Sequence, residues 1–223
     1  MGRVRDDIEG WLSQIIRPRC PEREPIIVAA AEAYDAAEEG GELPPELLRP
    51  VVDAASDSHR PVYEFAVPLL GRLTGRFAEA CQAVADMAGH PKSHVRFNAI
   101  LSLGRGTPAP FALEILRQGL RDTSSRVRAK AADWSGVLRL REMVPDLERA
   151  SANEQDPKTK REIDFELALL RDGYQLRPAD HDGFNVTAFC PGGIHSRWVS
   201  RTELEQRGIG AIVAELGKTP GTR

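Results

Sequence analysis

The stretch HPKSHVRFNAILSL, residues 90–103, is echoed by DTSSRVRAKAADWSGVL, residues 122–138. In each stretch a Val-Arg pair is followed by an alanine four residues after the valine, and the two valines, Val95 and Val127, are 32 residues apart. A unit of two short helices cannot bury its apolar face alone, so it stacks against a similar neighbour, and stacked units repeat their sequence. The echo therefore predicts a stack of helix pairs.

The chain up to about Gly173 is predicted to form one short helix after another. Each predicted helix carries apolar residues at helical spacing and ends at glycine or proline. Pro18 is expected to end the first helix, Pro50 to kink or divide the third, and Gly89 to close the fifth in the left-handed conformation. This gives about ten helices, over residues 8–16, 24–40, 44–55, 60–73, 76–89, 93–103, 110–120, 125–138, 142–150 and 158–172.

The repeated unit resembles HEAT and HEAT-like repeats of the armadillo type, whose first helix often follows an acidic turn residue and carries a Val-Arg pair near its start. Asp122 with Val127-Arg128 matches this pattern, whereas the copy at His90 lacks the aspartate. A weaker third copy, beginning at Asp156, lacks the valine. The resemblance covers about residues 20–173. It implies a mostly α-helical solenoid and no particular activity.

The resemblance also implies structural roles for three charged residues. In HEAT-like proteins, arginines at the position shared by Arg96 and Arg128 commonly form a ladder with acidic turn residues of neighbouring units. Asp122 is the acid that the resemblance implies as their partner. These three residues are therefore kept apart from the candidate binding residues.

Residues 174–217 are predicted to form a small α+β cap on the last repeat. The segments FNVTAF and IHSRWVS flank a Pro191-Gly192 turn, which indicates a β-hairpin, and residues 174–176 supply a third strand. Ser200, with Glu203 three residues on, is a capping box that starts a helix, whose apolar residues would pack on the ribbon. The predicted domains are residues 1–173 and residues 174–217, and residues 218–223 are predicted to be a disordered tail.

The composition is that of a folded soluble protein and excludes several classes. With 223 residues, 41% of them hydrophobic, and a net charge of −3, the chain is not a generally basic nucleic-acid coat. Its three cysteines form no CxxC pair, so they indicate neither a disulfide framework nor a thiolate zinc site. The N-terminal stretch is amphipathic and contains acidic residues, unlike a leader, and no apolar run approaches the ~20 residues of a membrane helix. A cytoplasmic location without membrane insertion is therefore expected.

The sequence indicates no catalytic or cofactor site. The patterns GxGxxG, GxxxxGK[ST], GxSxG and HExxH are absent. His181, Cys190 and His195 share a segment, but their spacing fits no known ligand pattern, so they are interpreted as parts of a solvated loop rather than a metal site. Cys81 and Trp134 fall on apolar helix faces and are assigned to the core rather than to nucleophilic attack or base stacking. No catalytic residue, metal or cofactor is therefore predicted.

Charge is distributed unevenly along the chain. Residues 22–57 hold ten acids against two arginines, a net charge of −8, whereas residues 92–141 hold ten bases against three acids, a net charge of +7. Such asymmetry steers encounters with a charged partner, although charge runs also occur as merely solvated helix faces. Trp198, beside Arg197 on a predicted strand, either marks a contact surface or packs the ribbon against the following helix. The residues predicted to bind a partner are Arg117, Arg121, Arg126, Lys130, Arg139, Arg197 and Trp198.

These observations favour a non-enzymatic protein-interaction module, an adaptor, inhibitor or assembly factor whose repeat surface binds a protein with an acidic surface. The alternative is a HEAT-like DNA-binding enzyme of the alkylated-base glycosylase type, with Asp133-Trp134 beside the arginines. Overall acidity argues against it, because phosphate binding favours a longer basic track. A bilin-lyase-like role rests on fold analogy alone. The sequence leaves the partner and the oligomeric state open.

Overall fold

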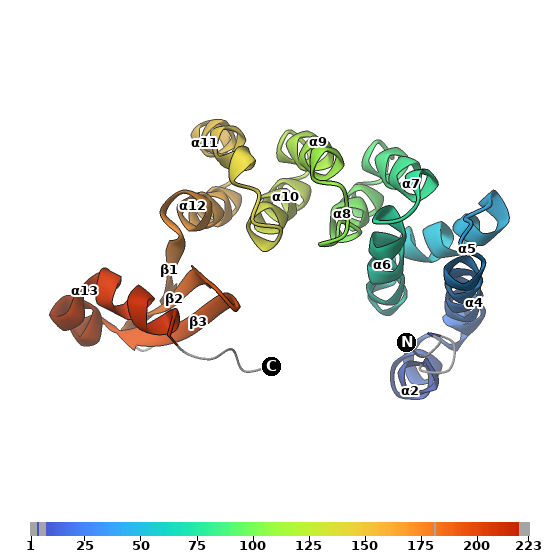
Figure 1. The fold of residues 1–223 in the computed structure, drawn as a ribbon, viewed down its shortest axis with the longest axis horizontal. Coiled ribbons are helices and arrows are strands. Elements are labelled where there is room, and N and C mark those ends of the chain that lie inside the picture. The colour runs from blue at the N-terminus through green and yellow to red at the C-terminus, as the bar shows by residue number, and fades with distance from the viewer. Residues whose placement is uncertain (1–3, 5–7, 181, 219–223) are drawn as a thin grey trace. The chain divides into compact units, whose positions relative to one another are not determined.

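The computed structural model describes residue 4, residues 8–180 and residues 182–218. Contacts between Cα atoms divide the chain into two compact units, residues 1–134 and residues 135–223. The first unit is helical, whereas the second combines helices with a small sheet (Figure 1). The domain boundary predicted at residue 173 lies inside the second unit, between a helix and the first strand. Of the tail predicted over residues 218–223, only Lys218 is among the described residues.

The first unit is built from short helices. From α6 onward, α7 and α9 form one row and α6, α8 and α10 form a second row (Figure 1). The elements are α2 (Glu9–Trp11), the π-helix η1 (Leu12–Ile16), α3 (Arg17–Arg19), the 3₁₀ helix η2 (Pro21–Arg23), α4 (Glu24–Gly40), α5 (Pro45–Ala55), α6 (Arg60–Thr74), α7 (Ala78–Ala88), α8 (Ser93–Leu101), α9 (Ala109–Leu120) and α10 (Ser125–Val137).

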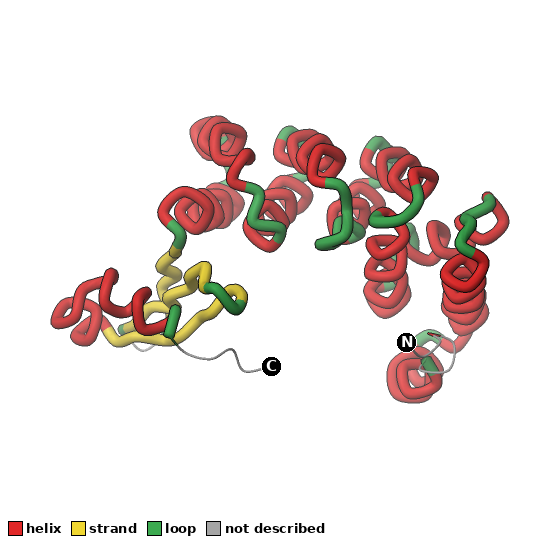
Figure 2. The backbone as a smooth tube through the Cα atoms, viewed as in Figure 1, coloured by secondary structure: helices red, strands yellow, loops and turns green. Residues whose placement is uncertain are grey.

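The second unit continues with a 3₁₀ helix, two α-helices, an antiparallel sheet in the order β1, β2, β3, and a final helix (Figure 2). The β2–β3 turn is Pro191-Gly192, with Cys190 paired to Gly193 across it, as the hairpin prediction requires. The elements are η3 (Arg141–Met143), α11 (Val144–Asn153), α12 (Pro157–Asp172), β1 (Tyr174–Ala179), β2 (Gly183–Cys190), β3 (Gly193–Ser200) and α13 (Arg201–Leu216). The predicted fold class, helical repeats followed by a hairpin and a helix, is confirmed.

The turns before α6, α8, α10 and α12 are built in the same way. In each, a side chain accepts a hydrogen bond from the backbone N–H two residues later. We call these side chains the turn acceptors: Asp57 (2.7 Å from His59 N), His90 (3.1 Å from Lys92 N), Asp122 (2.7 Å from Ser124 N) and Glu154 (2.9 Å from Asp156 N). They are 33, 32 and 32 residues apart. The third copy predicted from Asp156 therefore begins at Glu154, and a further copy begins at Asp57.

Burial follows the same spacing. Five residues after each turn acceptor a side chain at most 4% exposed enters the core, and nine residues after it another does so with 0% exposure. The apolar stripe that sequence periodicity predicts is therefore the one that holds neighbouring helices together. The first set is Val62, Val95, Val127 and Thr159, and the second is Ala66, Ala99, Ala131 and Ile163.

Helix α6 carries a glycine where it faces the residue that follows α8. A Cβ atom added at Gly71 would lie 2.8 Å from the Ser102 carbonyl oxygen. One turn further on, the Oγ1 atoms of Thr74 and Thr107 lie 2.7 Å apart, and both side chains are buried. Helix α6 therefore touches the segment after α8 through backbone atoms and a buried hydroxyl pair.

Three local predictions differ from the structure. Pro18 does not end the first helical segment, because the preceding turns widen into the π-helix η1 and α3 continues to Arg19. Pro50 does not divide α5, which runs unbroken from Pro45 to Ala55, although this proline lacks the N–H that would pair with the Glu46 carbonyl oxygen. Gly89 closes α7 with φ −88°, an ordinary right-handed conformation, so no left-handed glycine is needed there.

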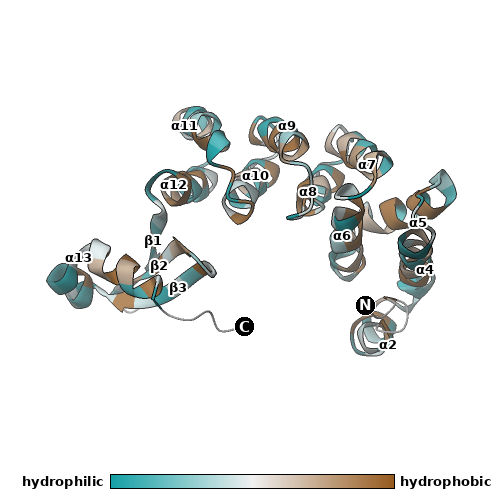
Figure 3. Cartoon of the chain, in the orientation of Figure 1, coloured by the Kyte–Doolittle hydropathy of each residue, from teal (hydrophilic) through white to brown (hydrophobic). Residues whose placement is uncertain are grey.

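One face of the sheet is covered by α13. Its core consists of Val186, Ala188, Cys190 and Val199 from the strands with Ile212 and Leu216 from the helix. Ser200 Oγ accepts the N–H of Glu203 at 3.0 Å, which is the predicted helix cap. In Figure 3 α13 carries both apolar and polar segments, as expected for a helix with one buried and one exposed face.

The substitution Gly71→Ala is expected to lower the free energy of unfolding by about 2 kcal/mol, because the clash with the Ser102 backbone outweighs the ~1 kcal/mol that alanine gains in a helix. Gly89→Ala is the matched control. Its Cβ would come no nearer than 3.7 Å to other atoms, so stability should change by less than about 1 kcal/mol. Urea denaturation measures both values. Equal stability of Gly71→Ala and the parent would show that there is room for a Cβ atom beside the Ser102 backbone.

Candidate functional site

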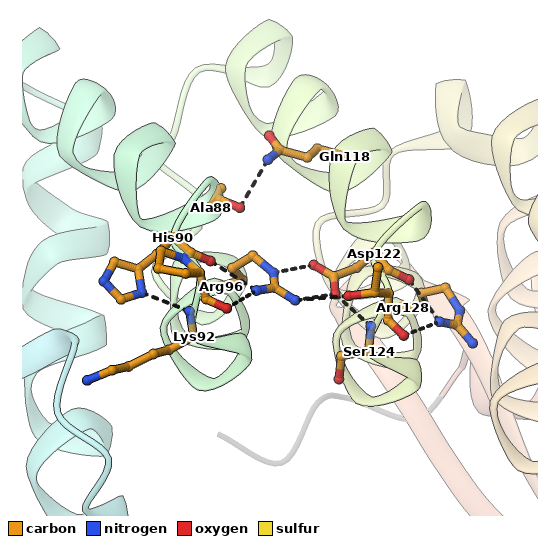
Figure 4. A network of polar contacts seen from close by, with 10 residues as sticks. Ala88, His90, Lys92, Arg96, Gln118, Asp122, Ser124 and Arg128 are labelled. Atoms are coloured by element: carbon orange, nitrogen blue, oxygen red, sulfur yellow. Dashed lines mark hydrogen bonds and ion pairs between the residues drawn. The ribbon is translucent and has the colours of Figure 1, made fainter.

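Arg96 joins two successive turns of the first unit. Its guanidinium contacts the Asp122 carboxylate through two hydrogen bonds, Nε to Oδ2 at 2.6 Å and Nη2 to Oδ1 at 2.8 Å (Figure 4). Its Nη1 also donates to the carbonyl oxygens of His90 and Pro91, each at 2.9 Å. Arg96 thus fixes the turn before its own helix and ties it to the turn before α10.

Arg128 occupies the equivalent position on α10, and its Nη1 binds the turn before α10 as Arg96 Nη1 binds the turn before α8. Its Nη1 donates to the Asp122 carbonyl oxygen at 2.8 Å and to the Thr123 carbonyl oxygen at 3.2 Å (Figure 4). Both are backbone atoms of the turn before its own helix. Arg96 makes two hydrogen bonds to the Asp122 carboxylate, and the charge of Arg128 acts on the same carboxylate.

The Asp122 carboxylate is only 8% exposed, and its surroundings favour the ionised form. Burial by itself would raise its pKa, but the hydrogen bonds from Arg96 and from the Ser124 N–H, with the positive charges of Arg96 and Arg128, lower the pKa below its ordinary value. The same contact raises the pKa of Arg96. The pair is therefore fully ionised at neutral pH.

A depression of about 930 Å³ lies beside this pair, between the end of α7 and α9. Arg117 and Glu114 of α9 line it, as does Arg121, the residue that follows the end of the helix. The Gln118 amide donates to the Ala88 carbonyl oxygen at 3.0 Å and so joins α9 to the end of α7. We call this surface the α9 depression; its lining includes His90, Pro91, Pro110, Arg117, Arg121 and Asp122.

Arg126 and Lys130 do not line the α9 depression. They lie over the ring of Phe97 on α8, at 4.2 Å and 5.8 Å from the ring centre. Lys130 also pairs with Asp133 at 2.7 Å and lies 5.2 Å from the ring centre of Trp134. The predicted cations of this unit therefore form two groups on either side of the α9–α10 turn.

Trp134 is half-buried rather than fully buried, and its indole Nε1 donates to the Leu103 carbonyl oxygen at 2.8 Å. Cys81 is also half-buried, its thiol donates to the Thr74 carbonyl oxygen at 3.3 Å, and burial raises its pKa. A raised pKa reduces the thiolate fraction at neutral pH. Both side chains therefore have structural contacts at the helix faces to which they were assigned.

The other predicted binding residues belong to the second unit. Arg139 lies 5.1 Å from the Phe189 ring centre. Arg197 is held by ion pairs with Glu203 and Glu215 of α13, which makes it part of the β3–α13 packing. Trp198 is 49% exposed, and its ring lies beside Gly183 of β2. The structure therefore does not bring all seven predicted residues into one site.

The segment considered for a metal site holds no assembled ligand set among the described residues. Cys190 is buried, and His195 Nδ1 lies 3.2 Å from the Leu216 carbonyl oxygen. His181 lies outside the described residues. In the part of the chain that the structure describes, no group of three or more His, Cys, Asp and Glu side chains is arranged to hold a metal ion.

Sequence inspection missed the Asp57 copy and the α9 depression. The copy carries a signal, because counting 33 residues back from Val95 and Ala99 reaches Val62 and Ala66. No pattern in the linear sequence indicates the α9 depression, because residues from two helix pairs form it.

A family model described as HEAT repeats matches residues 48–134, from α5 into α10. This segment of the chain is similar to HEAT repeats. The match covers the segment in which the turn acceptors Asp57, His90 and Asp122 recur, so the HEAT repeats contain both the Arg96–Asp122 pair and the α9 depression. A comparison with curated proteins finds no match. None of the described helices has both the length and the apolar character needed to cross a membrane.

Arg96→Ala is expected to lower the free energy of unfolding by about 2–3 kcal/mol, because it leaves the buried Asp122 carboxylate without its arginine. Arg128→Ala removes hydrogen bonds to carbonyl groups and should cost about 1 kcal/mol. A double-mutant cycle with Asp122→Ala, measured by urea denaturation, separates the two. The cost of Arg96→Ala should fall in the Asp122→Ala background; an unchanged cost would contradict the assigned pairing.

Stability should depend on the ionisation of Asp122 in acid. Because its folded-state pKa lies below that of an unfolded aspartate, about 3.9, its stabilising contribution is fully present above that pH and is lost as pH falls through the folded-state pKa. Asp122→Asn should therefore be less stable than the parent at pH 6, and the difference should shrink below about pH 4. Urea denaturation between pH 6 and pH 2 measures it. For Asp53→Asn, whose carboxylate is 66% exposed, the difference should stay small throughout.

Proposed function

We propose that this chain is a non-enzymatic protein-interaction module that binds an acidic surface of another protein through the cations on either side of the α9–α10 turn. HEAT repeats generally mediate protein–protein interactions by presenting an extended surface of stacked helices. Arg117 and Arg121 lie before the turn, and Arg126 and Lys130 lie after it. Adaptor, inhibitor and assembly factor are the roles that such a surface serves.

The observation that carries this proposal is the position of these cations. Arg117 and Arg121 line the α9 depression, where a partner's side chains have room to enter. Arg126 and Lys130 cover the Phe97 ring and hold their charge at the surface of the helix stack. A partner surface with carboxylates at matching positions would meet both groups at once.

The glycosylase alternative finds less support. Such an enzyme needs an aromatic face and a carboxylate directed at an extruded base. Here Asp133 pairs with Lys130, and the Trp134 indole is held by the Leu103 carbonyl group. These two residues therefore have structural partners, and we do not propose the enzymatic function.

A cytoplasmic location is part of the proposal. Cys20, Cys81 and Cys190 are free thiols, and free thiols are typical of reducing compartments. We propose no membrane-bound form.

The test begins with a pull-down from cell extract analysed by mass spectrometry, followed by binding rates for the captured partner. Two variants, Arg117→Glu/Arg121→Glu and Arg126→Glu/Lys130→Glu, should each slow association about tenfold at low salt and weaken its salt dependence. Lys158→Glu/Arg161→Glu on α12 changes the net charge equally and is the matched control. Its association rate should stay within about twofold of the parent.

Two results would contradict the proposal. One is association of both α9 and α10 variants at the parental rate under both salt conditions, which would make these cations solvated helix faces. The other is recovery of nucleic acid, with binding lost on nuclease treatment. Circular dichroism of each variant shows whether it has kept its helical content, so that a change in binding is not attributed to unfolding.

A further inference from the structure

The sheet of the second unit ends in an edge strand that is open to further pairing. The strand order is β1, β2, β3, so among the described residues β3 pairs with β2 alone (Figure 1). The two strands pair residue for residue over the whole length of β3, without a bulge. Natural edge strands are usually protected by short length, a bulge, proline or lysine. β3 has 8 residues and contains neither proline nor lysine, so its edge lacks these four protections.

A hydrogen bond at the end of the hairpin shows which backbone groups of β3 point outward. The N–H of Arg201 donates to the Asp182 carbonyl oxygen at 3.1 Å, one pair beyond the β2–β3 ladder. Because hydrogen-bonded and non-hydrogen-bonded pairs alternate along an antiparallel ladder, β3 bonds to β2 through its odd-numbered residues. The N–H and C=O groups of Ile194, Ser196 and Trp198 therefore point away from β2, where a further strand would meet them.

The side chains of the same three residues lie on the sheet face opposite α13. Val199 packs in the core with α13, and neighbouring residues of a strand point to opposite faces. Ile194 and Trp198 are 38% and 49% exposed, which makes them two of the most exposed large hydrophobic residues of the described chain. The Trp198 ring lies against Gly183 of β2, which holds it on this face. Exposed apolar side chains therefore flank the open edge.

This edge is complementary to itself. When two copies of β3 pair antiparallel about Ser196, Ile194 of each copy faces Trp198 of the partner subunit, since both residues are two positions from Ser196. Pairs of an aromatic and a β-branched side chain are among the favourable cross-strand pairs. The outward N–H and C=O groups of all three residues gain hydrogen-bond partners in the same register. A two-fold axis relates the copies, which is the commonest symmetry of oligomers.

Neither the nearest charges nor the neighbouring helix α12 opposes this pairing. On the α13 side, His195 would face Arg197 of the partner subunit, but Arg197 already forms ion pairs with Glu203 and Glu215 of its own chain. Helix α12 packs at the β1 end of the sheet, where Glu166 pairs with Arg177. The β3 edge is therefore the side of the sheet that α12 does not cover.

We propose that two copies of this chain pair through the outer edges of their β3 strands, antiparallel and centred on Ser196, to form one continuous sheet with three strands from each copy. Ile194 and Trp198 supply the apolar contacts across the new pair of strands. The dimer uses a surface of the second unit and none of the cations near the α9–α10 turn, so this inference and the proposed function can fail independently.

Sedimentation velocity of the full chain over a concentration series tests the inference. The parent should dimerise with a Kd below about 100 µM. Ile194→Glu places a carboxylate opposite Trp198 of the partner subunit twice in each dimer and should weaken association about tenfold. Val137→Glu is the matched control, because Val137 is β-branched, 39% exposed and located at the end of α10. Its association should stay within about twofold of the parent.

A second pair of variants tests the backbone pairing. Ser196→Pro removes the outward N–H at the centre of the edge, a position where edge strands tolerate proline, and should weaken association more than about tenfold. Ser196→Ala keeps that N–H and loses only the hydroxyl, so it should stay within about twofold of the parent. Amide exchange at Ile194 and Trp198 should also slow as the parent concentration rises. Circular dichroism shows whether each variant keeps its fold.

Three outcomes would overturn the inference. The first is a parent that remains monomeric at about 100 µM, including one whose β3 instead pairs with a strand of another protein. The second is a dimer that both Ile194→Glu and Ser196→Pro leave intact, which would place the interface elsewhere. The third is equal weakening by Ile194→Glu and Val137→Glu, which would mean that added charge alone lowers association.

Discussion

A single hydrogen bond, from a backbone N–H to the side chain two residues before it, closes the turn ahead of α6, α8, α10 and α12. Once this turn is closed, the residue five positions after the acceptor falls inside the helix stack, and the small or branched residue four positions later falls on the same face. The arginine between them, Arg96 on α8, then reaches the next acceptor. Burial, spacing and the ion pair therefore all follow from the geometry of one turn.

The helix stack was predictable because two of its repeats have similar sequences. Val95 and Val127 share their neighbours, so the echo is visible without a structure. The copy at Asp57 was not recognised because Val62 is followed by Tyr63 instead of arginine. The start of the copy at Glu154 was predicted two residues too late, since Thr159 replaces the valine. The fold requires an acceptor and a buried residue at fixed spacing. It does not require the Val-Arg pair that Val95 and Val127 begin.

The candidate site was predictable in composition and not in arrangement. The linear charge count shows the excess of cations in residues 92–141, but it does not show that Arg117 and Arg121 line the same depression. The separation of Arg126 and Lys130 depends on Phe97, which lies on another helix. His90 appeared in the sequence as a position lacking the expected aspartate. In the structure His90 lines the α9 depression. The linear sequence does not indicate this position.

The tryptophans give the molecule a property of a different kind, which is optical. The chain has three of them, one in the N-terminal helices, one on α10 and one on β3. Trp11 has a buried indole nitrogen, the indole of Trp134 is hydrogen-bonded, and Trp198 is 49% exposed. Indole emission shifts to longer wavelength, and collisional quenchers reach the ring more easily, as exposure to water increases. Each of these three regions therefore carries a tryptophan in a distinct environment. The unfolding of one region should change the emission wavelength of its tryptophan, with no added label.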